Sequence, residues 1–238
     1  MTELLFQTDS YLREFTAVVT EQIHDETGLV LDKSAFYPGG GGQPCDTGFI
    51  IVPNQVEWPV SKTRKQGANV VHILDGDLPE VGAMVRGRID WDHRYALMRT
   101  HTALHILCGV VYRDYGALVT GGNMEPLKGR MDFEFETLKG ELVSEIEASV
   151  NQEVSANREV RVKILPREEA FQIPDLIRTK INLLPEGIQQ IRTVEIVGLD
   201  LQADGGTHVR NTSEVGTIKI VDYKSKGAIN KRIYIEIL

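Results

Sequence analysis

The chain has 238 residues, 42% of them hydrophobic and 25% charged, which is the composition of an ordinary soluble globular protein. Its net charge of −8 argues against broad, non-specific binding to nucleic acid, since such binding needs clustered lysines and arginines. No apolar run has the length of a transmembrane helix, and the start of the chain lacks the pattern of a secretory signal. The two cysteines, Cys45 and Cys108, predict no disulfide framework, which favours a reducing compartment. Together these features lead us to expect a cytoplasmic protein without membrane association.

The first part of the chain, residues 1–90, is expected to be mostly β-structure. Short segments rich in valine and isoleucine alternate there with glycine, proline and aspartate. The predicted strands are 28–31, 48–52, 69–73 and 84–89. This spacing is typical of a small barrel or curled sheet.

From Asp92 onward the apolar period becomes that of a helix. Apolar side chains recur at helical spacing from Ala96 to Val111, and Gly116 is the expected end. We place a domain boundary near Trp91 without a flexible linker, which gives a domain of residues 1–90 and a second of residues 91–238.

The remainder of the chain mixes strands and helices. Residues 130–136 and 160–164 alternate as strands, residues 138–154 have helical spacing, and Pro166 opens a short acidic helix. Further strands are expected at 190–197, 215–221 and 232–237. The predicted fold class is therefore α+β, with a small N-terminal β-barrel followed by a two-layer α/β sandwich.

Two short histidine motifs predict a divalent metal site. His101 and His105 have the i, i+4 spacing that places both imidazoles on one helix face, and Asp204 and His208 flank a glycine pair. Either motif alone has a simpler interpretation, as packed helix histidines or as a tight turn. Together they supply three imidazoles and one carboxylate, a donor set that zinc accepts at about 2.0–2.2 Å.

Cys108 is a further potential ligand on the same helix. It follows His105 by three residues and therefore shares its face. However, His101 and Cys108 would lie about 10.5 Å apart along the helix axis, so one ion would not readily bind both. We interpret Cys108 as a small core residue.

A run of four glycines, residues 39–42, forms a second candidate site. Prolines flank the segment, and its backbone N–H groups could point at a ligand beside the amide of Gln43. The segment lacks the lysine and hydroxyl residue of a P-loop and has no GxGxxG spacing, so we expect no nucleoside triphosphate site.

With these pieces in order, the chain resembles the AlaX family, the free-standing alanyl-tRNA editing proteins related to the editing domain of alanyl-tRNA synthetase. The matching segments are FYPGGGGQPCDTG (36–48), RTHTALHIL (99–107), DGGTHVRNTSEVGTIKI (204–220) and RIYIEI near the end. The resemblance covers nearly the whole chain, including an N-terminal translation-factor-like barrel, and the glycine-rich segment is typical of the longer forms.

The resemblance implies ligand positions and one departure from the family pattern. His101, His105 and His208 occupy the zinc-ligand positions of the family, and Gln43 matches a glutamine of its editing pocket. The family usually has cysteine where this chain has Asp204. Because a carboxylate is a harder ligand than a thiolate, the bound ion could be zinc or another divalent metal.

The implied function is hydrolysis, in trans, of the ester that joins a wrong amino acid to alanine tRNA. Serine is the expected substrate and glycine the second, because a pocket sized for alanine rejects both weakly. The aminoacylated alanine tRNA is the expected partner. The predicted catalytic residues are Gln43, Thr102 and Thr207, and the predicted substrate-binding residues are Gly41, Gly42 and Gln43, whose loop could stabilise an oxyanion. The predicted metal ligands are His101, His105, Asp204 and His208.

Two other functions stay open at this point. One is a metal-dependent hydrolase of a different small ester or amide, which would be indifferent to tRNA. The other is a non-catalytic aminoacyl-tRNA-binding protein, in which Asp204 has removed the catalytic competence of the site.

Overall fold

The computed structural model describes residues 1–52, 56–135, 137, 139–179 and 187–238. They form two compact units, Met1–Ala96 and Leu97–Leu238, which join within one helix. Among the helices of the described ranges, none combines the length and the apolar character required to cross a bilayer. The predicted division near Trp91 into two separate folding domains stays a prediction.

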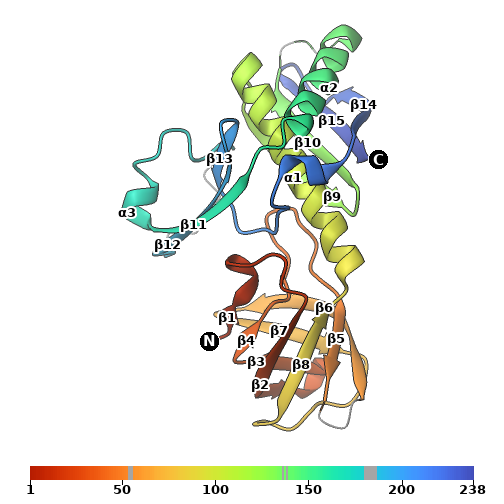
Figure 1. Cartoon of the computed structure of the whole chain (residues 1–238), viewed down its shortest axis with the longest axis vertical. Helices are drawn as coiled ribbons and strands as arrows, with labels where there is room; N and C mark the ends of the chain where they lie inside the picture. Colours follow the sequence, from red (N-terminus) through yellow and green to blue (C-terminus); the bar gives the residue numbers. More distant parts are fainter. Residues whose placement is uncertain (53–55, 136, 138, 180–186) are drawn as a thin grey trace. The chain divides into compact units, whose positions relative to one another are not determined.

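Six strands of the first unit close into a ring in the order β2-β3-β7-β6-β5-β8 (Figure 1). Their bounds are β2 Glu14–Ile23, β3 Gly28–Leu31, β5 Gly48–Ile51, β6 Glu57–Gln66, β7 Asn69–Leu74 and β8 Met84–Ile89. A separate parallel pair joins β1 (Glu3–Leu4) to β4 (Lys33–Ser34), and two single-turn 3-10 helices are η1 (Leu5–Gln7) and η2 (His24–Glu26). Alternate residues of β2, Phe15, Ala17 and Val19, point into the core of the ring.

Helix α1, Trp91–Tyr115, carries the first histidine motif. The Asp90 carboxylate accepts a hydrogen bond from the N–H of His93 at 3.2 Å and so caps the first turn. At the other end, Gly116 has φ +67° and its N–H bonds to the carbonyl of Tyr112 at 2.9 Å, the left-handed conformation that ends many helices. The predicted helix and its end at Gly116 are confirmed.

The second unit contains a four-stranded sheet in the order β14-β15-β10-β9. Its bounds are β9 Val119–Glu125, β10 Lys128–Glu134, β14 Ile218–Ser225 and β15 Asn230–Ile237. Helices α1 and α2 (Gly140–Ser155) lie along one side of this sheet (Figure 1). Helix α1 packs closely on strand β10, since a Cβ at Gly129 would meet the Leu104 side chain at 3.0 Å.

A smaller sheet, β11-β12-β13, completes the second unit. Its bounds are β11 Val160–Pro166, β12 Gln190–Ile196 and β13 Asp200–Ala203. The short helix α3 (Arg167–Ala170) follows Pro166 as predicted, and η3 (Thr212–Val215) follows the second histidine motif. Residues 136 and 138 of the predicted elements lie outside the described residues.

The predicted fold class, α+β with a two-layer α/β sandwich in the second half, is wrong. Strands make up 43% and helices 24% of the structure, and the strands of the second unit lie in two separate sheets. The prediction of a small translation-factor-like barrel was also incomplete, because it named four strands and six form the ring. Strand β2 was missed despite its apolar alternation, whereas other missed strands are polar or rich in glycine. For example, β6 contains Pro59 with Lys62 and Arg64, and β9 contains Gly121 and Gly122, so neither shows the apolar alternation of a strand.

Candidate metal centre

His101 and His105 lie one turn apart on α1, and both are only 6% exposed. Their ring centroids are 5.1 Å apart. The helix thus presents two buried imidazoles side by side, as the spacing predicts.

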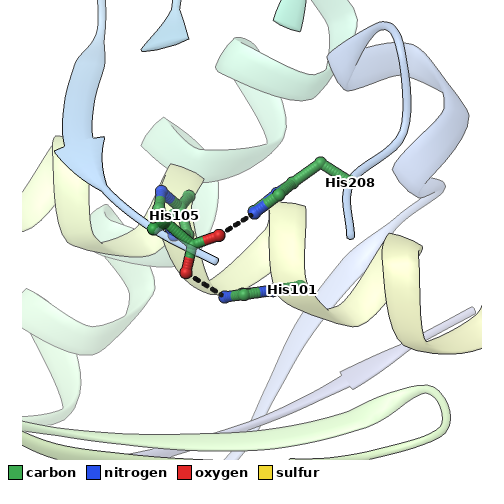
Figure 2. Close-up of side chains that lie close together, drawn as sticks. His101, His105 and His208 are labelled. Atoms are coloured by element: carbon green, nitrogen blue, oxygen red, sulfur yellow. Dashed lines mark hydrogen bonds and ion pairs between the residues drawn. The ribbon is translucent and has the colours of Figure 1, made fainter. Parts of the chain in front are cut away.

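The second motif brings a carboxylate and a third imidazole to the same place (Figure 2). The Asp204 Oδ2 atom accepts hydrogen bonds from the N–H of Gly206 at 2.8 Å and faces His208 Nε2 at 2.9 Å. The other oxygen, Oδ1, lies 3.5 Å from His101 Nε2. The ring of His208 stacks on that of His101 at a centroid distance of 4.2 Å.

The four predicted ligand residues therefore converge. One ligand atom from each of His101, His105, Asp204 and His208 lies within 4.8 Å of the others, and the cluster is a group that could hold a metal ion. All four residues belong to the second unit, so the cluster is built within one compact body.

The electrostatics of the cluster favour metal binding. Burial is the main cause that lowers the pKa of His101 well below its ordinary value and lowers the pKa of His208 to about 4. Burial alone would raise the pKa of Asp204, but the neighbouring His101 and His208 outweigh it and hold that pKa well below its usual range. For His101, His208 and Asp204, neutral imidazoles beside an ionised carboxylate are the protonation states that a divalent ion requires of its ligands.

Two of the histidines have a second partner on the ring nitrogen that points away from Asp204. His105 Nδ1 lies 3.1 Å from Asp200 Oδ2, and His208 Nδ1 lies 3.2 Å from Thr102 Oγ1. Burial alone would lower the pKa of His105, but the hydrogen bond with Asp200 and the charges of Asp200 and Asp204 together outweigh it and raise the pKa. Thr102 also accepts a hydrogen bond from the N–H of Val209 at 3.3 Å, so its hydroxyl bridges the two motifs.

Cys108 lies outside the cluster. It is 2% exposed, its Sγ is 3.3 Å from Gln202 Nε2, and burial raises the pKa of its thiol. A buried thiol of this kind is inert, which agrees with its interpretation as a core residue.

Thr207, a predicted catalytic residue, is fully buried within the turn between Asp204 and His208.

The glycine-rich segment is a loop of the first unit. Gly40 and Gln43 are joined by a two-way backbone bridge, with N···O distances of 3.1 and 3.0 Å. Gly41 and Gly42 between them are exposed and have φ values of +58° and +90°, which favour glycine, whereas Gln43 is 3% exposed. The buried Asp46 closes the loop by accepting a hydrogen bond from the N–H of Tyr37 at 2.5 Å.

Two residues beside the cluster were missed by the sequence analysis. Asp200 contacts His105, and Arg192 donates to the carbonyl of Asp204 at 3.0 Å while its Nη1 lies 3.6 Å from the Asp204 carboxylate. Both are buried charges on strands of the smaller sheet. The available signal was a charge on a strand face that is otherwise apolar, as at Arg192, which shares its face of β12 with Val194 and Ile196.

Comparison with known proteins gives the class first. Residues 191–234 match the family described as the threonyl and alanyl tRNA synthetase second additional domain, and residues 7–93 match the class II (A) tRNA synthetases. The chain is thus one of the proteins that share domains with class II tRNA synthetases.

Individual relatives give the family. The chain is 42% identical to an alanyl-tRNA editing protein AlaX-M of Saccharolobus solfataricus, with 98% of both chains covered, and 38% identical to one of Methanosarcina acetivorans over the whole of both. It is also 40% identical to an alanine–tRNA ligase of Ignicoccus hospitalis, of which it covers 24%. The chain belongs to the AlaX-M family of alanyl-tRNA editing proteins, which confirms the resemblance seen in the sequence motifs.

Proposed function

We propose that this chain is an aminoacyl-tRNA deacylase that edits mischarged alanine tRNA in trans. The observation that carries this proposal is the convergence of His101, His105, Asp204 and His208 in a chain that matches AlaX-M proteins from end to end. The bond broken is the ester between the tRNA and a wrongly attached amino acid, and water supplies the hydroxyl.

The residues present fit a divalent ion, and we propose zinc. His101 and His208 turn Nε2 toward Asp204, and His105 has Nδ1 engaged by Asp200, which leaves its Nε2 for the cluster. Three imidazole nitrogens and one carboxylate oxygen are donors that zinc accepts, and the oxygen also suits harder divalent ions. A bound ion would supply Lewis-acid activation beside the ester.

The residues around the cluster orient the ligands. The Thr102 hydroxyl contacts His208 Nδ1 and the backbone N–H of Val209, so we assign it the role of holding the His208 ring in place. Arg192 fixes the backbone at Asp204 and places a positive charge beside its carboxylate. Thr207, at the centre of the turn, is proposed as a contact for the amino acid of the substrate.

The glycine-rich loop of the first unit is proposed as a contact for the substrate. Its backbone bridge uses the N–H groups of Gly40 and Gln43, and the N–H groups of Gly41 and Gly42 lie between them in the exposed tip. We propose that these two N–H groups and the Gln43 amide bind the substrate.

The proposed substrates are alanine tRNA charged with serine and, second, with glycine. The test is deacylation by zinc-loaded protein of alanine tRNA charged with serine, glycine or alanine. Selective release of serine, with the alanine ester left intact, is the expected result.

Two outcomes would replace this proposal. Equal hydrolysis of a serine ester with and without attached tRNA would identify a hydrolase of small esters. Tight binding of serine-charged tRNA without turnover by the metal-loaded protein would identify a binding protein, and would place the loss of activity at Asp204, where the family usually has cysteine.

A further inference from the structure

The outer side of His105 is closed by a buried carboxylate from another element. Asp200, the first residue of β13, is 4% exposed, and its Oδ2 lies 3.1 Å from His105 Nδ1. Its approach to α1 depends on Gly109, one turn after His105, since a Cβ at that position would meet the Cβ of Asp200 at 3.0 Å and Leu199 at 2.8 Å. The strand and the helix are thus packed so that this carboxylate reaches this imidazole.

Gln202 fixes the orientation of the Asp200 carboxylate, and the guanidinium of Arg178 lies beside it. Gln202 Nε2 donates to Oδ2 at 2.7 Å, and Arg178 Nε lies 3.5 Å from Oδ1. The guanidinium of Arg178 is itself placed over the ring of Tyr112 on α1, with 3.8 Å between Cζ and the ring centroid. The Oδ2 atom of Asp200 is thus held by a hydrogen bond from Gln202, while Oδ1 lies within ion-pair distance of Arg178 without a hydrogen bond.

A carboxylate in this position determines which nitrogen of His105 carries hydrogen. An ionised carboxylate only accepts hydrogen bonds, so His105 must hold its hydrogen on Nδ1 and keep the lone pair of Nε2 for the cluster. The partner of His208 imposes no such choice, because the Thr102 hydroxyl can either donate or accept. We propose that Asp200 is the positioning residue that makes His105 a metal ligand and that it raises the affinity of the cluster for its ion. This inference rests on the metal site of the proposed function and not on the tRNA substrate.

The substitution Asp200→Asn tests this proposal because it changes the hydrogen-bond chemistry and keeps the shape. If the amide oxygen faces Arg178, the NH2 group faces His105 and favours the tautomer with hydrogen on Nε2, which cannot bind the metal of the cluster through that nitrogen. If the amide is flipped, its NH2 group opposes the Arg178 donor. Arg178→Gln is the matched control, since it removes a charge from the same network and leaves the contact between Asp200 and His105 in place.

The experiment measures zinc affinity of the full chain by competition with a chromophoric chelator. We expect the dissociation constant to rise about 10–100-fold in Asp200→Asn, the usual cost of losing an outer partner of a metal ligand, and to change less than about threefold in Arg178→Gln. Cobalt loading gives a second readout, because the visible spectrum of the four-coordinate ion should change in Asp200→Asn and stay as in the wild type in Arg178→Gln. Equal zinc affinity and equal spectra in the wild type and Asp200→Asn would overturn the proposal.

Nitrogen-15 NMR of the zinc-loaded wild type provides a test that needs no variant. His105 should show hydrogen on Nδ1 and metal on Nε2, and metal on Nδ1 would refute the role of Asp200 even if Asp200→Asn does not fold. Failure of the wild-type chain to bind zinc or cobalt would instead refute the metal site itself. The two results separate failure of this inference from failure of the proposed function.

Discussion

Both units bury polar side chains, but they do so in different ways. In the first unit, Arg94 and Asp46 are both fully buried, and the guanidinium also donates to the carbonyls of Ser10 at 3.0 Å and Ala35 at 2.6 Å. In the second unit, three imidazoles converge on a single carboxylate, that of Asp204. In the first arrangement, opposite charges and backbone carbonyls provide the partners of the buried groups. The second brings together three imidazoles and one carboxylate, an arrangement that is favourable when a metal ion binds all of them.

A histidine of the first unit sharpens this contrast. His72 is fully buried in the ring of strands, with Nδ1 bonded to the carbonyl of Leu29 at 3.0 Å and Nε2 to the Ser34 hydroxyl at 2.8 Å. It has one partner for each nitrogen and no second imidazole among its hydrogen-bond partners. Burial of a histidine is therefore no sign of a metal site, whereas convergence of several ligand atoms is.

The largest expected effect comes from removing a ligand. His208→Ala should lower the rate of serine release from alanine tRNA by about a thousandfold or more, because a Lewis acid contributes several kcal/mol to the transition state. His101→Ala should do the same. The measurement is single-turnover deacylation together with zinc content.

The exposed His24 gives the control for this experiment, and His24→Ala should keep both activity and zinc. Full activity in His101→Ala and His208→Ala would show that the cluster is as structural as the buried pair of the first unit.

The next effect is on stability and belongs to the first unit. Arg94→Met would leave the Asp46 carboxylate buried without its charge partner, which should reduce the free energy of unfolding by about 3–5 kcal/mol. Arg88→Met is the control, because the side chains of Arg88 and Glu57 are 35% and 40% exposed and such a pair contributes about 1 kcal/mol or less. Urea unfolding of both variants measures the difference, and similar losses would contradict the contrast.

The sequence allowed much of the candidate site to be predicted, because its ligands lie in two short motifs with helical and turn spacing. His101 and His105 follow directly from the period of α1, and the four ligands do converge. Asp200 and Arg192 could not be predicted in the same way. Their roles depend on where the smaller sheet lies against α1, and a single charge in a strand does not reveal its partner.

The fold was less accessible than the site. Strands made of short apolar runs, such as β3 and β7, agree closely with their predicted ranges, and α1 ends at its glycine. The long strand β6 alternates only weakly, since its inward residues Val60 and Thr63 are separated by a shift in register. Such a strand is specified by its neighbours in the ring and not by its own sequence, so it was not among the predicted strands.

The smallest effect is on the pH dependence of stability and comes from His72, the buried histidine of the first unit. Burial lowers the pKa of His72 to about 4, against partial opposition from the hydrogen bond with Leu29. His72 is protonated near pH 6.5 in the unfolded chain but only near pH 4 in the folded protein. The stability contributed by neutral His72 is therefore complete above pH 6.5 and is lost as the pH falls toward 4, by about 3 kcal/mol in total.

The variant His72→Gln isolates this contribution. Urea unfolding of the wild type and of His72→Gln between pH 7 and pH 4 should give curves that converge toward low pH, because only the wild type has this proton to refuse. His24→Gln, which removes an exposed histidine, should keep the slope of the wild type. Parallel curves for the wild type and His72→Gln would mean that the folded protein accepts the proton as readily as the unfolded chain. The contrast between a buried neutral histidine in the first unit and a metal-binding cluster in the second would then no longer hold.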